Sequence, residues 1–225
     1  MEPRQPPRAA AALALALAVT VCILQAGPVP AGGAAVPTPD QVLNRVLAAQ
    51  AHAPATASAD AALKLRIHKP VTAAPDCEFR GTLQIEGGRQ TLTVNQGGSS
   101  AMCWVANRMA VGQLFESSQP LEAVLAQFNF QVTGEREVDG RRYYLVQGTA
   151  RNPSDNVKSL TAWVDYDRGL VTSGTVEYGW GRLDAEQRFT RMNETWILTH
   201  QYLYTPKFDA SLEIDYTNFR LGPGR

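Results

Sequence analysis

The sequence has few residues of the kinds that carry chemistry. Its 225 residues include three cysteines and three histidines, and Lys+Arg and Asp+Glu both number 21, so the formal net charge is zero. A neutral chain gives no electrostatic reason to expect a nucleic acid or an anionic membrane surface as partner. So few cysteines and histidines also limit the redox and metal sites that the chain could build. The composition therefore favours binding over catalysis.

The sequence contains no recognisable catalytic pattern. The three histidines, His52, His68 and His200, fit no metal-ligand spacing, and solvated or structural roles are expected for them. There is no CxxC pair, no phosphate-binding glycine loop and no serine in a nucleophile elbow. Residues 165–169 open like a calcium loop, but the Glu expected at the twelfth position is missing, so a hairpin turn is favoured. We predict no enzyme, no catalytic residue, no metal and no cofactor; a hydrolase would need a nucleophile–base pair.

The first 35 residues resemble an export signal. Arg4 and Arg8 precede an uncharged run over residues 9–26, and small residues offer cleavage after Ala26 or after Ala35. This layout is typical of a secretory signal peptide. A retained N-terminal membrane anchor is the alternative, because 18 residues are just long enough to span a bilayer. We expect residues 1–35 to be signal peptide and leader, and residues 36–225 to form one periplasmic or secreted domain.

Two cysteines, Cys77 and Cys103, remain after such processing. An even pair in an exported chain favours a disulfide. Closing that loop would stabilise the fold by about 3–4 kcal/mol in the chain-entropy model. The alternative is a pair of buried thiols in adjacent strands.

The first predicted helix begins at Thr38. Thr38 is a suitable N-cap, Pro39 occupies N1, and Gln41 completes a capping box. An apolar stripe follows at positions 42, 43, 46 and 47, and the helix is expected to end by Pro54. A second helix is predicted at residues 119–128, with one apolar face made by Leu121, Val124, Leu125 and Phe128.

Much of the remaining chain alternates apolar and polar residues, which is typical of antiparallel strands with one dry face. In the first half the predicted strands cover residues 63–68, 79–86, 92–94 and 102–106, with a hairpin turn at 86–89. In the second half they cover residues 130–138, 141–150, 159–166 and 170–180, and a turn is predicted at 181–184. Tyr202 and Tyr204 are expected to share a face with Trp196, Leu198 and His200. A second row is expected to contain Phe208, Leu212, Ile214 and Tyr216. Ordinary core packing would also explain such rows.

The order of several motifs resembles the LolA/LolB-like superfamily. The motifs are residues 125–130, the hairpin at 138–145 with Val-Asp-Gly-Arg-Arg-Tyr-Tyr-Leu, Ala-Trp-Val-Asp at 162–165, and Trp-Ile-Leu at 196–198. The resemblance covers roughly residues 38–221, as a pattern of elements more than of identical residues. It implies an α+β, mostly antiparallel β fold: an unclosed curved β-barrel with helices covering its open mouth.

In that superfamily the hydrophobic concavity receives acyl chains, so the resemblance implies a carrier of lipid or lipoprotein. Lid helices would move while the sheet stays rigid. The alternative is an envelope-stress sensor, or interaction module, that regulates a membrane partner. A monomer is expected. The candidate cavity residues are Leu65, Ile67, Leu83, Ile85, Leu92, Trp104, Leu125, Phe128, Trp163 and Trp196.

Overall fold

The computed structural model describes residues 24–25, 36–51, 56–68, 76–86, 89–97, 121–152, 157–192 and 195–222. Two helices lie among the described residues: α2 (Pro39–Ala51) and α5 (Leu121–Leu125). The strands before α5 are β1 (Leu24–Gln25), β2 (Thr56–Ile67), β3 (Cys77–Glu86) and β4 (Arg89–Gly97). Those after it are β5 (Phe128–Val138), β6 (Arg141–Ala150), β7 (Val157–Asp165), β8 (Leu170–Tyr178), β9 (Gly181–Met192), β10 (Thr195–Thr205) and β11 (Ala210–Leu221).

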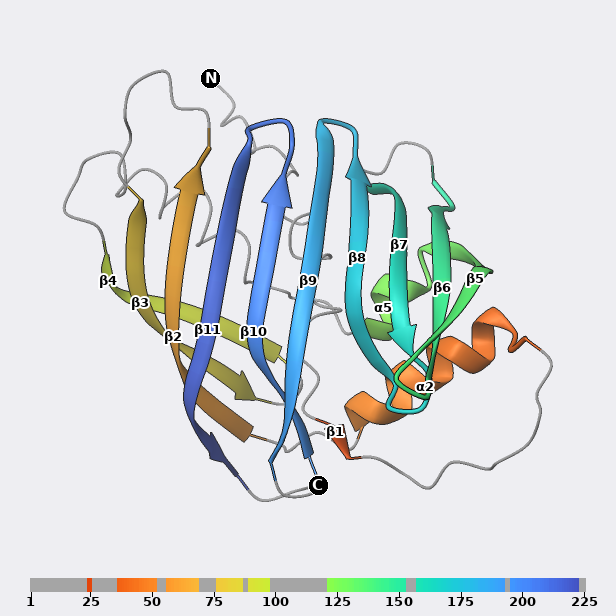
Figure 1. Ribbon diagram of the computed structural model, residues 1–225, viewed down its shortest axis with the longest axis horizontal. Coiled ribbons are helices and arrows are strands. Elements are labelled where there is room, and N and C mark those ends of the chain that lie inside the picture. Colours follow the sequence, from red (N-terminus) through yellow and green to blue (C-terminus); the bar gives the residue numbers. More distant parts are fainter. Residues whose placement is uncertain are drawn as a thin grey trace, which may run out of the picture.

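The strands form one antiparallel sheet in the order β4-β3-β2-β11-β10-β9-β8-β7-β6-β5 (Figure 1). From β5 to β11 each strand pairs with the next one in the chain, and β11 then pairs with β2. Among the described residues no pairing joins β4 to β5, so the sheet is not closed into a barrel. β1 lies off this path and pairs with β10; it falls within the segment that the sequence predicts to be removed on export.

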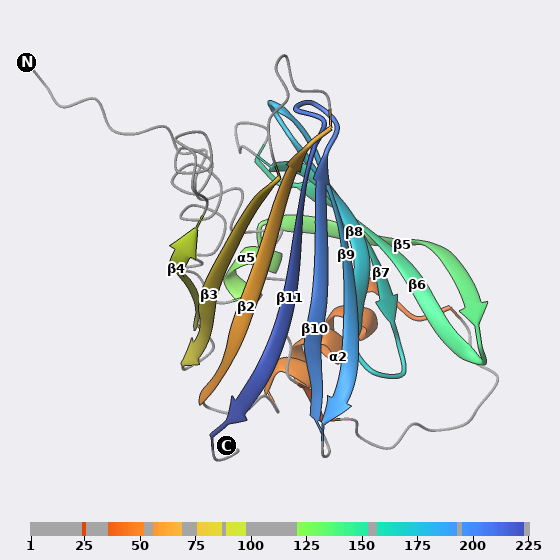
Figure 2. The ribbon, with the colours of Figure 1, turned by 60° about the vertical axis from the view of Figure 1, so that its left-hand side comes forward.

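The sheet curves strongly, and both helices lie on its inner side (Figure 2). Val42 and Val46 of α2 and Leu121 beside them pack against Tyr144 and Val164 of the inner face. The polar residues that alternate with these apolar ones along each strand lie on the opposite face, which is turned to solvent. The fold expected from the sequence, a curved and unclosed antiparallel barrel with helices, is therefore confirmed.

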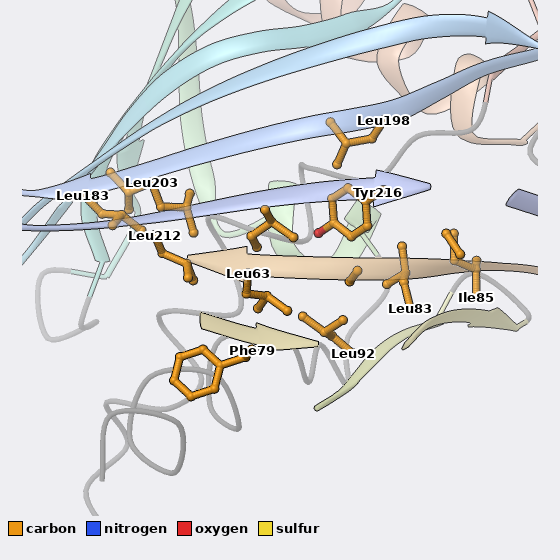
Figure 3. Close-up of a cluster of buried hydrophobic side chains, with 14 of the residues drawn as sticks. Leu63, Phe79, Leu83, Ile85, Leu92, Leu183, Leu198, Leu203, Leu212 and Tyr216 are labelled. Carbon is orange, nitrogen blue, oxygen red and sulfur yellow. The ribbon is translucent and has the colours of Figure 1, made fainter. Parts of the chain in front are cut away.

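The main core lies on the inner face of the sheet, mostly over β2–β4 and β9–β11 (Figure 3). Val124 of α5, Phe128 of β5 and buried residues of β7 and β8 belong to the same cluster. Leu63, Leu83 and Ile214 are exposed by no more than 3%. A strict alternation along β3, with every second residue buried from Cys77 to Ile85, supplies one side of this core. The buried hydroxyl of Tyr216 donates to Gln201 Oε1 over 3.2 Å, a polar pair within otherwise apolar packing.

The second predicted helix is shorter than expected. α5 ends at Leu125, and Phe128 is the first residue of β5, where it pairs with Ala150. Phe128, Phe130 and Val132 alternate onto the inner face, and this strand period outweighs the helical spacing that Phe128 shares with Leu121 and Val124.

Other strand boundaries also differ from the sequence prediction, among them the end of β8 and the start of β2. β8 ends at Tyr178, so the turn lies at 179–180 instead of 181–184. The earlier turn places Leu183 opposite Val176, where it is buried. β2 begins at Thr56 instead of residue 63, because Ala57, Ala59 and Ala61 supply its inner face although alanine has little intrinsic preference for strands.

The two predicted apolar rows are also corrected. A β-bulge between Leu198 and His200 changes the alternation, so Leu198 joins the core while His200 lies with Tyr202 and Tyr204 on the outer side. Phe208 lies in the turn before β11 and is 60% exposed, so it does not continue the row of Leu212, Ile214 and Tyr216.

Several predictions fall outside the described residues: His52, Trp104, Cys103 and the strand expected at 102–106. Cys77 is buried at the start of β3, and its pairing with Cys103 stays a prediction. No helix within the described ranges has the length and hydropathy needed to cross a bilayer.

Candidate functional site

A groove opens between α2, α5 and the start of β5, and we call it the helix groove. Its volume is about 570 Å³, within the range typical of small-molecule sites. The apolar lining comes from Leu43, Leu47, Leu125, Phe128 and Phe130. The polar lining comes from Asp40, Asn44, Glu122, Asn129 and Arg151. The groove thus combines an apolar wall with a polar rim of both charge signs.

The sequence of α2 divides the helix into two faces. Val42, Val46 and Ala49 are buried against the sheet, while Leu43 and Leu47 are half-buried and line the groove. The capping box predicted at its start is present. The Thr38 amide donates to Gln41 Oε1 over 2.8 Å, and the Gln41 amide donates to Thr38 Oγ1 over 3.3 Å. This fixes the end of the helix from which Pro39, Asp40 and Leu43 face the groove.

The opposite wall is built on the edge strand β5. The rings of Phe128 and Phe130 lie 6.0 Å apart. Gly148 of β6 gives Phe130 the room to cross it, since a Cβ there would come within 2.6 Å of that ring. At the rim, Arg151 Nε donates to Asn129 Oδ1 over 3.2 Å.

The turn between β7 and β8 holds α2 in place. Gly169 has φ +70°, and a Cβ on it would lie 2.6 Å from the Arg45 carbonyl oxygen and 2.9 Å from Ala49 Cβ. Glycine therefore satisfies both the left-handed backbone and the close approach of the helix. The Arg45 guanidinium lies 5.4 Å from the centre of the Tyr166 ring, and Ala49 packs on Leu170. α2 is anchored at this end of the groove.

A buried ion pair supports the same turn. Asp165 is 1% exposed; its Oδ1 accepts the Arg168 amide over 3.2 Å, and its Oδ2 lies 3.6 Å from Arg168 Nε. Burial raises the pKa of the Asp165 carboxyl, opposed by the attraction of Arg168. Burial likewise lowers the pKa of Arg168, whose guanidinium lies 4.0 Å from the centre of the Trp196 ring.

The structure brings together some of the predicted cavity residues and separates others. Leu125 and Phe128 line the helix groove. Leu83, Ile85 and Leu92 are buried in the main core, with the half-buried Leu65 packed against them. Trp196 packs near α2 on Leu170 and Ala49.

Two predicted cavity residues lie elsewhere. Ile67 is 39% exposed at the end of β2, beyond the inner-face run of that strand. Trp163 pairs with Leu145 and Ser173 and is flanked in β7 by Ala162 and Val164, whose side chains pack on the inner face, so its ring lies on the outer face. The large aromatic side chain of Trp163 suggested the inner face, but side-chain size alone does not determine which face of a sheet a residue occupies.

Sequence reasoning missed Phe130, Arg151, Asn129 and the role of Leu43 and Leu47. The apolar stripe of α2 includes Leu43 and Leu47, but it is wider than one contact face needs. The extra width of this stripe indicates that the sheet does not cover one edge of it, and Leu43 and Leu47 lie on that edge.

One group among the described residues could hold a metal ion: His200, Glu213 and Asp215, whose ligand atoms lie within 4.8 Å of one another. His200 Nδ1 lies 2.8 Å from Asp215 Oδ1 and Nε2 lies 4.0 Å from Glu213 Oε1. These contacts join β10 to β11 across the outer face, and they give His200 a structural role without an ion.

No family model and no curated protein matches the chain. Among solved structures it is similar to a DUF1329 family protein from Desulfovibrio piger, with 12% identity, a TM-score of 0.53, and coverage of 83% of this chain and 92% of that one. It is also similar to a LolA superfamily protein from Nitrosomonas europaea, with 12% identity, a TM-score of 0.51, and coverage of 84% and 95%. The chain therefore has a LolA-like fold, as the motif order led us to expect.

Proposed function

We propose that this LolA-like protein binds the acyl chain of a lipid or lipoprotein in the helix groove and carries it through the bacterial envelope. The observation that carries the proposal is the 570 Å³ groove with five large apolar side chains, placed where helices meet the edge of an unclosed sheet. In this proposal the protein is exported, acts as a monomer in the periplasm, and binds its lipid ligand without forming a covalent bond.

The physical chemistry of the groove is sufficient for such a ligand. Each buried methylene contributes about 0.8 kcal/mol, so eight buried methylenes would contribute roughly 6 kcal/mol before the loss of ligand freedom is subtracted. The polar rim would remain in water beside the head group of the ligand. On one side of this rim Arg151 is held by Asn129, and on the other side α5 contributes Glu122.

Access to the groove is proposed to depend on α5 more than on α2. α2 has 13 residues and is anchored through Gly169, Tyr166 and Leu170. α5 has five residues, and its inward anchors are Leu121 and Val124. A helix this short has little stability of its own. Displacing it would widen the groove while the sheet and α2 keep their positions.

The proposal is tested with delipidated protein and a fluorescent fatty acid. Leu43→Glu and Leu125→Glu place a carboxylate on opposite walls of the groove at half-buried positions. We expect each change to weaken binding at least about tenfold, equivalent to about 1.4 kcal/mol. Ile67→Glu is the matched control, because Ile67 is exposed outside the groove. Leu83 and Ile85 are unsuitable, since a charge in the main core would unfold the protein.

Equal binding by the parent, both groove variants and the control would contradict the proposal. Native mass spectrometry of protein purified from its own envelope supplies the second measurement. A retained lipid supports a carrier. A membrane protein that co-purifies in detergent, with no retained lipid, would favour an envelope sensor instead.

A further inference from the structure

A second groove lies on the outer face of the sheet, away from both helices, and we call it the outer groove. Its volume is about 400 Å³. Two cross-strand rows of side chains line it. The first row is Leu145, Trp163, Ser173, Glu186 and Tyr202, one residue from each of β6 to β10. The second row is Thr161, Thr175, Asp184 and Tyr204, from β7 to β10.

The shape follows from side-chain size along these rows. The central strand β8 contributes only Ser173 and Thr175 as side chains, while Trp163 stands on β7 and Tyr202 and Tyr204 on β10. β7 and β10 are separated by three strand spacings, or about 14 Å. The small residues at positions 162, 174 and 185 lie between the two rows. The outer groove is therefore a trough with small polar residues on its floor and aromatic rings as walls.

Both walls are held in position. The Arg136 guanidinium lies 4.1 Å from the centre of the Trp163 ring. The Tyr204 hydroxyl donates to Asp209 Oδ1 over 2.9 Å, and the Tyr204 ring meets His68 edge to face at 6.0 Å. Elsewhere the outer face carries charged cross-strand pairs such as His200–Asp215 and Lys64–Glu78. The outer face of an antiparallel sheet is usually polar and solvated, and the half-buried aromatic walls of the outer groove depart from this pattern.

The lining of the outer groove holds two carboxylates, Asp184 and Glu186. Asp184 is paired with Arg182 Nε over 3.2 Å and accepts the Thr175 hydroxyl over 2.8 Å. Among the described residues, no hydrogen bond or ion pair engages the Glu186 carboxylate or the Tyr202 hydroxyl. Arg136 brings a positive charge to the Trp163 wall, so the groove and its border hold charges of both signs. A strongly charged partner therefore finds little complementarity here.

From these observations we infer that the outer groove binds a neutral saccharide chain. A pyranose has an apolar C–H face that stacks on aromatic rings, and a rim of hydroxyls that donate to a carboxylate. Trp163 and Tyr202 supply the ring faces, Glu186 the acceptor, and Ser173 and Thr175 short hydroxyls on the floor. The width of the trough requires an oligosaccharide, since one sugar ring could not touch both walls. The inference does not depend on the acyl-binding function, because the two grooves share no residue.

The test uses isothermal titration calorimetry of the full mature chain with cellotetraose and chitotetraose. Tyr202→Ala should weaken binding about tenfold or more through lost stacking, and Glu186→Gln about threefold to tenfold through a weaker acceptor. Glu177→Gln is the control, since Glu177 is an exposed acidic residue of β8 outside the outer groove. Ser173→Tyr fills the trough without removing any aromatic wall, and should abolish binding in a protein whose circular dichroism and thermal unfolding match the parent.

Loss of saccharide binding in the groove variants, with the Glu177→Gln variant and the fatty-acid affinity unchanged, supports the inference. Three results overturn it: no saturable binding of either saccharide, binding that survives Ser173→Tyr, or tight binding of an oligolysine peptide in place of saccharide. Failure of fatty-acid binding alone contradicts only the proposed carrier function.

Discussion

The contact between Gly169 and α2 gives a quantitative test of how the helix groove is held. Gly169→Ala adds one methyl group at φ +70°, against the Arg45 carbonyl and Ala49. Gly140→Ala is a matched control, because Gly140 has φ +71° and a methyl group added there would have no neighbour within 4 Å. The two substitutions share the backbone strain and differ in the contact with the helix.

The structure sets the expected magnitudes. An L-residue in the left-handed region costs roughly 1–2 kcal/mol, and Gly140→Ala should lower the free energy of unfolding by that amount. At Gly169 the added methyl must also displace backbone, since the Arg45 carbonyl oxygen would lie 2.6 Å away. Overpacking of this kind costs about 1–3 kcal/mol. Gly169→Ala should therefore destabilise by about 2–5 kcal/mol in total.

Urea unfolding followed by tryptophan fluorescence and by circular dichroism measures both variants under the same conditions. The free energies are compared only if the slopes with urea agree, since a changed slope signals a changed native or denatured state. A destabilisation of Gly169→Ala no larger than that of Gly140→Ala would refute the close packing of α2 on the β7–β8 turn.

Three further predictions concern the core, the buried carboxyl and the cysteines. Ile214→Ala, at a residue with no exposed surface, should destabilise by about 2–5 kcal/mol in urea unfolding, whereas Ile67→Ala should change stability by less than about 1 kcal/mol; similar values would contradict the assigned core. The pKa of the Asp165 carboxyl is raised above its ordinary value of 3.8 in the folded state. As pH rises, this carboxyl therefore loses its proton at a lower pH in the unfolded chain than in the folded protein, and its contribution to the free energy of unfolding decreases. The parent should thus gain stability relative to Asp165→Asn as pH falls from about 7 towards about 4, and a constant or shrinking difference in urea titrations would contradict this. Cys77 and Cys103 should resist alkylation in denaturant until a reductant is added, and reduction should cost about 3–4 kcal/mol; labelling without reductant would exclude the disulfide.

Local rules in the sequence predicted the elements whose signals are short-range. The capping box of Thr38 and Gln41 forms as predicted, because both partners lie within one helical turn. The hairpin at Asp139 and Gly140 forms with φ values of 51° and 71°, which suit a two-residue turn between strands. The strand over Arg141–Ala150 has the predicted bounds.

Signals that depend on distant partners were not readable in the same way. The bulge at Thr199 reverses the alternation in β10, and no glycine or proline marks it. The bulge at Thr133 and Gly134 does so in β5, where the glycine was the one local signal. Ala57, Ala59 and Ala61 form a strand because β3 and β11 pair on both sides. Trp163 could be placed on the outer face only once its pairing with Ser173 was known.

The candidate site shows the same division. Periodicity marked Leu43, Leu47 and Leu125 as apolar positions, but their meeting across one groove depends on how α2 docks on the β7–β8 turn through Gly169. Arg151 and Asn129 lie beside α5 through the fold of β5 and β6, and no spacing in the sequence connects them with α2.

Photoaffinity labelling tests acyl binding in the helix groove most directly. A diazirine-bearing fatty acid is irradiated with the mature protein, and the labelled peptides are mapped by mass spectrometry. Acyl binding in the helix groove predicts adducts on the groove residues of α2, on α5 and on residues 128–130, and the loss of these adducts when unlabelled fatty acid competes. Competable adducts that fall instead on the outer face of β7–β10, or no competable adduct at all, would contradict it.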